Sequence, residues 1–512
     1  MRRKLRWDEI AGILLMIVSL GMLGVSVYLC TGSDIWYDEL FSMGLGNQSL
    51  GSLVSITAKD VHPPLYYIFL KIALGFAGEG YARQVTAAKL LSCLPFFLCL
   101  CLAVTRVRKY FGLLAAGLFS FLVLSMPRLA DYTVEIRMYG FALLFVTACM
   151  LYAYELALNA GMADKKKTWA ALTVCALAAC YTHYYACMAA FMVYLYLFVC
   201  FWQKKALRKQ IRPFMISGFF CAAGYLPWIL LAVRRQLGSV KENYWIEAVS
   251  WRTLGGCVKF LFQPSFENGL LNTLLAIVFF CIYGILIIFV LTGLLRRKGQ
   301  EDKSLFVLGG AAVLAGLAVF GIVASLLVRP IFVYRYMLPA LGVFWLGFAV
   351  GVSTLRKKSL VIPLLLLLVV TGTRNYRAFY GEEMWKRLQM EQALDKLGEL
   401  EAEDVVIFNF VQAQGVVNYY IDKDSFLWYE ETEELIQEMF PKDRTLVEGE
   451  FSDEAGIQRI WELLDQGKRL WFFGSGAARE EILEKWSQAG IEADAPMEAM
   501  IERYWFNLYR IH

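Results

Sequence analysis

The chain has 512 residues, 58% of them hydrophobic and 15% aromatic, and a formal net charge of +5. Its mean hydropathy is +0.51, and apolar runs close to twenty residues long recur as far as residue 372. This composition excludes an ordinary soluble globular protein. It predicts a polytopic, mainly α membrane protein, because a helix of about 20 residues crosses a bilayer and satisfies its own backbone hydrogen bonds there.

Eleven apolar segments are predicted to cross the membrane: 10–30, 83–105, 110–127, 140–160, 168–182, 185–202, 213–233, 270–295, 304–328, 336–354 and 359–373. Basic residues cluster at every second junction, in the stretches 2–6, 106–109, 165–167, 204–212, 296–303 and 356–358. The positive-inside rule places these junctions in the cytoplasm. The sequence therefore predicts a multi-pass plasma-membrane protein with its amino terminus inside and its carboxyl terminus outside.

One apolar stretch, residues 64–77, does not fit this alternation. It has about fourteen residues, which is too short for a span. Counting it as a span would also move every later basic cluster to the outside. We therefore predict an interfacial or re-entrant helix in the outer leaflet.

The composition changes near residue 374. Residues 374–512 contain 15 Lys and Arg against 29 Asp and Glu, a net charge of −14, whereas residues 1–373 carry +19. We predict a transmembrane domain over 1–373 and a small soluble, extracytoplasmic α/β domain over 374–512. In the second domain, periodicity predicts helices at 382–400, 431–439, 454–464 and 479–489, and strands at 405–410, 470–473 and 504–509.

Two acidic clusters lie between the first two spans. Asp38 and Glu39 follow the first span, and about twenty residues later Asp60 and His62 precede a pair of prolines. Carboxylates at the edge of a bilayer are costly to bury and usually functional. The loop is typical of an enzyme that acts on a lipid-borne substrate at a membrane surface. The alternative is that the acids are solvated juxtamembrane residues and that His62 starts a helix.

Other polar residues stand out at junctions predicted to lie on the same outer face. They are Arg137 and Tyr139, His183 and Tyr184, and Arg335 and Tyr336. An arginine outside runs against the positive-inside trend, and a guanidinium matches the oxygen atoms of a lipid phosphate. The alternatives are an ion pair of Arg137 with Glu135 or Asp131, snorkelling of Arg335 to headgroups, and an ordinary aromatic belt around His183.

Together these motifs resemble the GT-C superfamily of polyprenyl-phosphate-sugar glycosyltransferases, in the branch of the protein O-mannosyltransferases and the lipid A aminoarabinose transferase. The resemblance rests on Tyr37-Asp38-Glu39, Asp60-x-His62-Pro63-Pro64-Leu65-Tyr66-Tyr67, Glu135-x-Arg137-x-Tyr139, His183-Tyr184, Pro227-Trp228 and Arg335-Tyr336. It implies a GT-C-like helical bundle. It also implies transfer of a sugar from polyprenyl phosphate to a cell-envelope glycan, lipid or protein, with inversion at the anomeric carbon.

The resemblance further implies roles for the first loop. Asp38 is the expected general base, and partial desolvation at the bilayer edge would raise its basicity. Glu39 is expected either to orient the acceptor or to cap a helix. Asp60 and His62 are expected to contact substrate, and either to bind a divalent metal or to hold the loop in shape.

The remaining residues are assigned to donor binding, with Arg137 and Arg335 as phosphate ligands and with Tyr139, His183, Tyr184 and Tyr336 beside them. Membrane lipids are the expected surroundings. No nucleotide-binding motif is recognisable in the sequence, and a nucleic-acid partner is not predicted.

Two other classes of function remain as alternatives. A transporter or lipid flippase would place charges midway along its spans and break helices at the bilayer centre, whereas mid-span charges are scarce in this sequence. The second alternative is a non-catalytic scaffold for envelope assembly. The intact Asp38 and Asp60 clusters argue against it.

Overall fold

The computed structural model describes residues 6–32, 35–158, 165–233, 236, 246–296, 301–355, 357–401, 404–409, 426–429, 439, 445–448, 451–501 and 504–512. The chain divides into two compact units, and each is discontinuous in sequence. The first comprises Met1–Tyr28, Val54–Phe69 and Lys89–Tyr380, and the second comprises Leu29–Leu53, Leu70–Ala88 and Gly381–His512.

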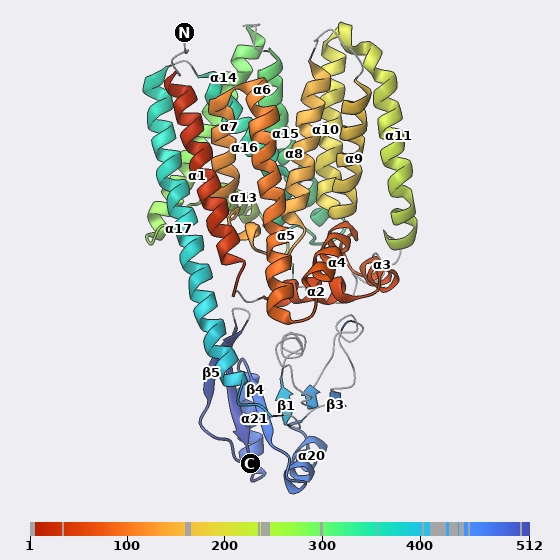
Figure 1. Ribbon diagram of the computed structural model, residues 1–512, viewed down its shortest axis with the longest axis vertical. Helices are drawn as coiled ribbons and strands as arrows, with labels where there is room; N and C mark the ends of the chain where they lie inside the picture. The colour runs from red at the N-terminus through yellow and green to blue at the C-terminus, as the bar shows by residue number, and fades with distance from the viewer. Residues whose placement is uncertain are drawn as a thin grey trace. The chain divides into compact units, whose positions relative to one another are not determined.

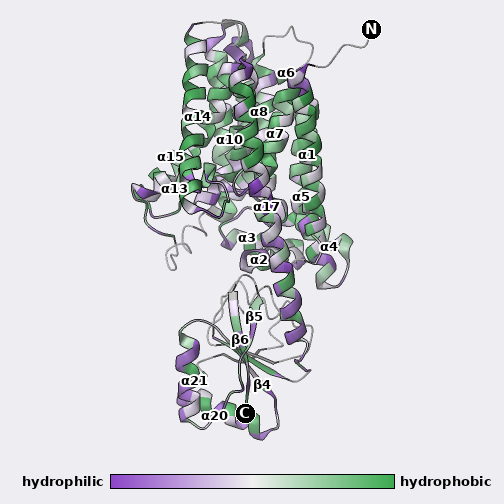
Figure 2. Ribbon diagram, turned by 90° about the vertical axis from the view of Figure 1, so that its left-hand side faces the viewer, coloured by the Kyte–Doolittle hydropathy of each residue, from purple (hydrophilic) through white to green (hydrophobic). Residues whose placement is uncertain are grey.

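Each of the eleven predicted spans coincides with a helix (Figure 1): α1 (Trp7–Leu29), α5 (Tyr81–Leu102), α7 (Leu113–Ser125), α8 (Tyr139–Ala157), α9 (Lys166–Thr182), α10 (Tyr184–Gln203), α11 (Ile211–Trp228), α14 (Gly269–Leu295), α15 (Glu301–Leu327), α16 (Leu338–Thr354) and α17 (Lys358–Leu397). Nine helical segments of the described chain are long and apolar enough to cross a membrane. The helices α7 and α9 are shorter, with 13 and 17 residues. Apolar residues extend along α14, α10 and α1 (Figure 2), and the predicted polytopic helical class is confirmed.

Shorter helical elements connect these helices: α2 (Tyr37–Asn47), α3 (Leu50–Lys59), α4 (Leu65–Ala77), η1 (Ala103–Val107), α6 (Arg108–Phe111), η2 (Asp131–Thr133), η3 (Lys205–Gln210), η4 (Ile229–Val233), α13 (Arg252–Phe262) and η5 (Tyr334–Met337). The 13 residues of α4 extend over only about 20 Å. That length is too short for a hydrocarbon core of about 30 Å, which agrees with an interfacial or re-entrant helix.

The helices α1 and α7 approach each other closely at two glycines. A Cβ atom added to Gly12 would lie 2.2 Å from the carbonyl oxygen of Leu113, and one added to Gly117 would lie 2.1 Å from that of Gly12. Small residues at such crossings let membrane helices pack backbone to backbone. This contact attaches the first helix of the chain to α7, in which 12 of the 13 residues are buried.

We predict that Gly12→Ala destabilises the protein while Gly21→Ala, on the same helix, does not. The added methyl group at Gly12 has no space, and overpacking of this kind costs about 1–3 kcal/mol. Nothing lies within 4 Å of a Cβ atom at Gly21, where alanine should be neutral or slightly stabilising because it favours a helix. Thermal unfolding of the two variants in detergent tests this, and equal midpoints would argue against the close contact.

The second unit contains a six-stranded sheet in the order β3-β2-β1-β4-β6-β5. Its strands are β1 (Val405–Phe408), β2 (Phe426–Tyr429), β3 (Thr445–Glu448), β4 (Leu470–Gly474), β5 (Met497–Ile501) and β6 (Tyr504–Ile511). The strands β1 to β4 are parallel, and β6 pairs antiparallel with β4 and β5. The helices α20 (Glu454–Asp465) and α21 (Ala478–Gln488) match two predicted helices, and the predicted α/β class of this part is confirmed.

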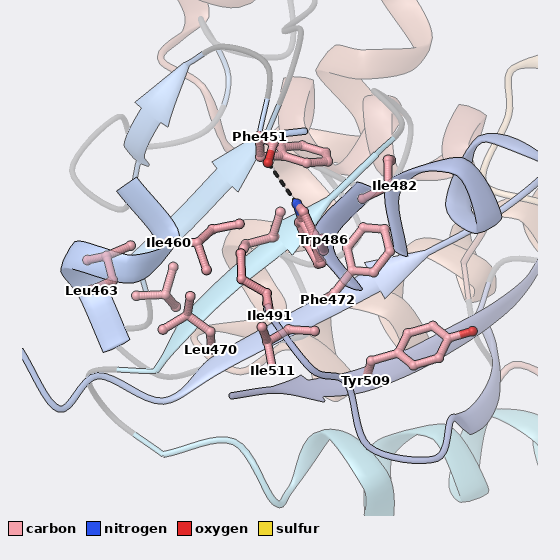
Figure 3. Close-up of a cluster of buried hydrophobic side chains, with 12 residues drawn as sticks. Phe451, Ile460, Leu463, Leu470, Phe472, Ile482, Trp486, Ile491, Tyr509 and Ile511 are labelled. Carbon is pink, nitrogen blue, oxygen red and sulfur yellow. Dashed lines mark hydrogen bonds between the residues drawn. The ribbon is translucent and has the colours of Figure 1, made fainter. Parts of the chain in front are cut away.

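A buried apolar cluster holds this sheet against α20 and α21 (Figure 3). Trp486 on α21 is 1% exposed, and its ring lies 5.0 Å from that of Phe472 on β4. Its indole Nε1 donates to the carbonyl oxygen of Phe451 over 2.8 Å. The one polar atom of this side chain is therefore satisfied inside the core, as buried polar groups require.

Segments from before residue 89 also belong to the second unit. Arg387 of α17 donates to the carbonyl oxygen of Thr31, and the Gln48 side-chain amide donates to the carbonyl oxygen of Met439 over 3.1 Å. The expected domain boundary at residue 374 falls inside α17, and the expected helix 382–400 is the end of α17. The expected helix 431–439 lies outside the described residues except for Met439.

Candidate functional site

The acids of the first loop lie at the start of α2, in the second unit. Trp36 is the N-cap, and its backbone N–H donates to the Glu39 carboxylate over 3.0 Å. Glu39 is 3% exposed, and its side chain closes the first turn as in a capping box. Asp38 is half-buried in the same turn, where the helix dipole favours a negative charge. Of the two roles expected for Glu39, this geometry provides the helix cap.

Asp60 and His62 form a close pair after α3, in the first unit. The Nδ1 atom of His62 lies 3.1 Å from Oδ2 of Asp60, and His62 is 8% exposed. Burial acts to raise the pKa of Asp60, but the hydrogen bond and charge of His62, with a contribution from Arg137, lower that pKa below its usual value. Asp60 is therefore ionised at neutral pH and accepts a hydrogen bond from Nδ1–H of His62.

His183 is held by the start of the following helix. It is the N-cap of α10, and its Nδ1 atom accepts the backbone N–H of Tyr185 over 3.1 Å. Burial, together with the positive charges of His62, Arg137 and Arg335, holds the pKa of His183 well below its usual value. The imidazole is therefore neutral at neutral pH, and with Nδ1 as an acceptor its proton is on Nε2.

Aromatic rings from three junctions surround His183. Its ring centroid lies 5.7 Å from that of His62, 5.4 Å from that of Tyr139 and 5.3 Å from that of Tyr336. The ring of Tyr185 extends the group, 4.8 Å from that of Tyr336. The first unit thus brings together side chains from the end of α3, the start of α8, the turn between α9 and α10, and η5.

Two arginines add positive charge to this group. Arg137 is 5% exposed and Arg335 is partly buried, and both are close enough to His183 to lower its pKa. We call Asp60, His62, Arg137, Tyr139, His183, Arg335 and Tyr336 the His183 cluster.

Tyr132 lies beside the His183 cluster in the structure. No motif in the sequence singled it out. Its ring lies 5.2 Å from that of Tyr139. Burial raises the pKa of Tyr132 well above its usual value, the Glu135 and Asp131 carboxylates raise it further, and Arg335 acts in the opposite direction. Tyr132 therefore keeps its hydroxyl proton as a donor at neutral pH.

Tyr184 contacts protein groups instead of completing this cluster. Its hydroxyl donates to Oε1 of Gln236 over 2.5 Å and accepts the indole N–H of Trp228 over 3.1 Å. Both hydrogen-bonding functions of the hydroxyl are therefore engaged inside the protein. This arrangement favours a structural role over the substrate-binding role expected for Tyr184.

Lys89 on α5 is a further candidate. It is 3% exposed, and one turn further along the helix the Sγ atom of Cys93 contacts the carbonyl oxygen of Thr133 over 3.0 Å. A buried cation in a membrane helix is a functional candidate in its own right. The sequence signal was present, because Lys89 lies inside the predicted span 83–105.

Asp60 and His62, the expected metal ligands, contact each other in the His183 cluster. Among the residues that the structure describes, no group of three or more His, Cys, Asp or Glu is arranged to hold a metal ion. The Asp60 carboxylate is already paired with His62, and Nδ1 of His183 already accepts a backbone N–H.

Comparisons with solved structures identify the fold. The chain is similar to ArnT from Cupriavidus metallidurans in the apo state, with a TM-score of 0.60, 11% sequence identity and 97% of both chains covered. It is equally similar to ArnT bound to undecaprenyl phosphate, with a TM-score of 0.59, 12% identity and 97% of both chains covered. The chain therefore has the fold of ArnT over nearly its whole length, as expected from the sequence.

Comparisons at the level of sequence found no match. No protein-family model matches the chain, and no curated protein matches it. At 11–12% identity the likeness to ArnT is one of fold.

The low pKa of His183 leads to a testable pH dependence of stability. Below the usual histidine value of about 6.5 the unfolded chain takes up a proton that the folded chain does not. Stability is therefore present above that pH and is lost as the pH falls toward the folded pKa, by up to about 1.4 kcal/mol per pH unit. We predict that His183→Asn, which keeps an N-cap acceptor, loses less thermal stability than wild type between pH 7 and pH 5.

The matched control for this prediction is His512→Asn, because the His512 side chain is 52% exposed at the end of the chain. It should follow the wild-type pH curve. Parallel curves for His183→Asn and wild type would show that His183 is not held neutral.

Proposed function

We propose that the chain is an integral membrane glycosyltransferase that moves a sugar from a polyprenyl-phosphate donor to a cell-envelope acceptor on the extracytoplasmic face. The observation that carries the proposal is the meeting of Arg137 and Arg335 around a neutral His183. Two guanidiniums near the bilayer edge are suited to a lipid phosphate. The fold supports it, since an ArnT structure of the same fold was solved with undecaprenyl phosphate bound.

The proposed reaction is a single inverting displacement. The acceptor oxygen forms a bond to the anomeric carbon as the bond from that carbon to the phosphate oxygen breaks. The leaving phosphate takes the electron pair and gains negative charge, which Arg137 and Arg335 offset. The acceptor proton goes to Asp38, the proposed general base.

The neutral members of the His183 cluster complete the proposed donor site. Nε2–H of His183 and the hydroxyl groups of Tyr139 and Tyr336 are donors suited to phosphate or sugar oxygens. His62, oriented by Asp60 over 3.1 Å, is assigned to the same site. The identity of the sugar would follow from the groups that meet its hydroxyls.

We predict that lysine cannot replace the arginines of this site. Arg137→Lys and Arg335→Lys keep the charge but lose the bidentate geometry, and loss of one charge-assisted hydrogen bond costs about 1.5–3 kcal/mol, or ten-fold or more in affinity. Titration of each purified variant with undecaprenyl phosphate measures this change.

The matched control for the arginine variants is Arg128→Lys, whose side chain is 67% exposed near η2. It should bind like wild type. If both test variants also bind like wild type, neither guanidinium holds the phosphate, and Lys89 becomes the first cation to test.

We predict that Asp38→Asn removes the base with little change in size. Turnover should fall by about 10²–10⁴-fold, the usual contribution of proton transfer, while affinity for undecaprenyl phosphate survives. The measurement is release of polyprenyl phosphate from labelled polyprenyl-phosphate sugars, beside a binding titration. Near wild-type turnover in a folded variant would remove Asp38 from the mechanism.

A further inference from the structure

A buried chain of hydrogen bonds runs from α11 to the last turn of α3. The indole N–H of Trp228 donates to the hydroxyl of Tyr184, which donates to Oε1 of Gln236. The side-chain amide of Gln236 in turn donates from Nε2 to the carbonyl oxygen of Thr57 over 3.1 Å. Only this orientation of the Gln236 amide satisfies both neighbours, because a backbone carbonyl can accept but cannot donate.

The chain is closed off from water. Gln236 is 6% exposed, Trp228 is 3% exposed and Thr57 is fully buried. Apolar side chains pack around it, and they are Ala58, Cys180, Tyr225 and Ala232 with the partly buried Val54 and Leu177. Inside such a cluster a lost partner leaves a desolvated polar group, which costs more than an exposed hydrogen bond is worth.

Gln236 acts at a helix terminus. The helix α3 ends at Lys59, and the last four carbonyl groups of a helix have no partner within that helix. The carbonyl of Ile56 accepts the backbone N–H of Asp60 over 3.0 Å, and the next carbonyl, that of Thr57, accepts the Gln236 amide. Gln236 therefore caps α3 from a position 179 residues away in sequence.

The capped turn leads directly into the His183 cluster. Asp60 is three residues after Thr57, and its carboxylate is paired with His62. The ring of His62 reaches to 5.7 Å from that of His183, which is one residue before Tyr184. The hydrogen-bonded chain thus connects the end of α3, which precedes His62, with Tyr184, which follows His183.

We infer that Gln236 is a positioning residue: by capping α3 it fixes the turn that presents Asp60 and His62 beside His183. Tyr184 and Trp228 orient the Gln236 amide for this role. The consequence for donor binding rests on the proposed function, whereas the capping itself does not.

The test uses Gln236→Leu, which removes both hydrogen bonds at similar volume, and Gln236→Glu, which keeps the acceptor for Tyr184 and loses the donor to Thr57. The matched control is Gln210→Leu. Gln210 accepts an indole N–H, that of Trp169, over 3.1 Å, and it lies at the opposite end of α11, before the helix begins. Hydrogen exchange of residues 54–62 and affinity for undecaprenyl phosphate are measured on all four full-length proteins.

We expect faster exchange over 54–62 in both Gln236 variants, together with an affinity for undecaprenyl phosphate that is lower by about three- to ten-fold. Gln210→Leu should match wild type in both measurements. If Gln236→Leu fails to fold, Gln236→Glu, which stays polar and of equal size, decides the question.

Unchanged exchange over 54–62 would overturn the capping role. Faster exchange with unchanged affinity would show that the cap is structural and does not position the site. If wild type itself does not bind undecaprenyl phosphate, the proposed function fails, and the exchange data still decide whether Gln236 holds the turn.

Discussion

Positive charge buried at the end of a helical bundle is the constraint on which the site depends. A guanidinium removed from water must be compensated by a counter-charge or by hydrogen bonds. Asp60 supplies a negative charge near Arg137, and its own pKa is lowered partly by that arginine. His183 stays neutral in the same field. A lipid phosphate is the partner proposed for the two guanidiniums, because their geometry matches phosphate oxygens.

The site residues are held by helix termini. Glu39 caps α2, His183 caps α10, and Gln236 caps α3 from a distant part of the chain. Backbone groups at a helix end need partners, and in each case the partner is a polar side chain. A helix end cannot shift without breaking its cap, so each cap holds its helix end and the polar groups beside it in place.

Much of the fold could be predicted because hydrophobic length and charge act locally. Each apolar run of membrane length became a helix, and the short run 64–77 became the 13-residue α4. The misses have physical reasons. The last predicted span runs on as α17 to Leu397, because an amphipathic extension has no local stop signal. The strands β2, β3 and β5 were not predicted, since short strands depend on their neighbours in the sheet.

For the candidate site, residue type alone singled out Asp60, His62, Arg137 and His183, since polar groups near a bilayer are rare enough to notice. Local sequence could not predict which residues each of these side chains contacts in the folded protein. Tyr184 and Tyr185 are adjacent in sequence, yet the Tyr184 hydroxyl bonds to Gln236 while the Tyr185 ring packs on Tyr336. Successive residues of a helix face different directions, about 100° apart.

The sequence by itself determined that this is a polytopic membrane protein, where most of its apolar helices begin and end to within a few residues, and which polar residues break the apolar pattern. These properties follow from the free energy of transferring each segment into lipid, which depends on the segment alone. Only the tertiary structure decided which of these polar residues come together in the His183 cluster. It also decided that His183 is neutral and that Gln236 caps α3. These properties depend on contacts between residues far apart in the chain, and both burial and the field of neighbouring charges exist only once the helices have packed.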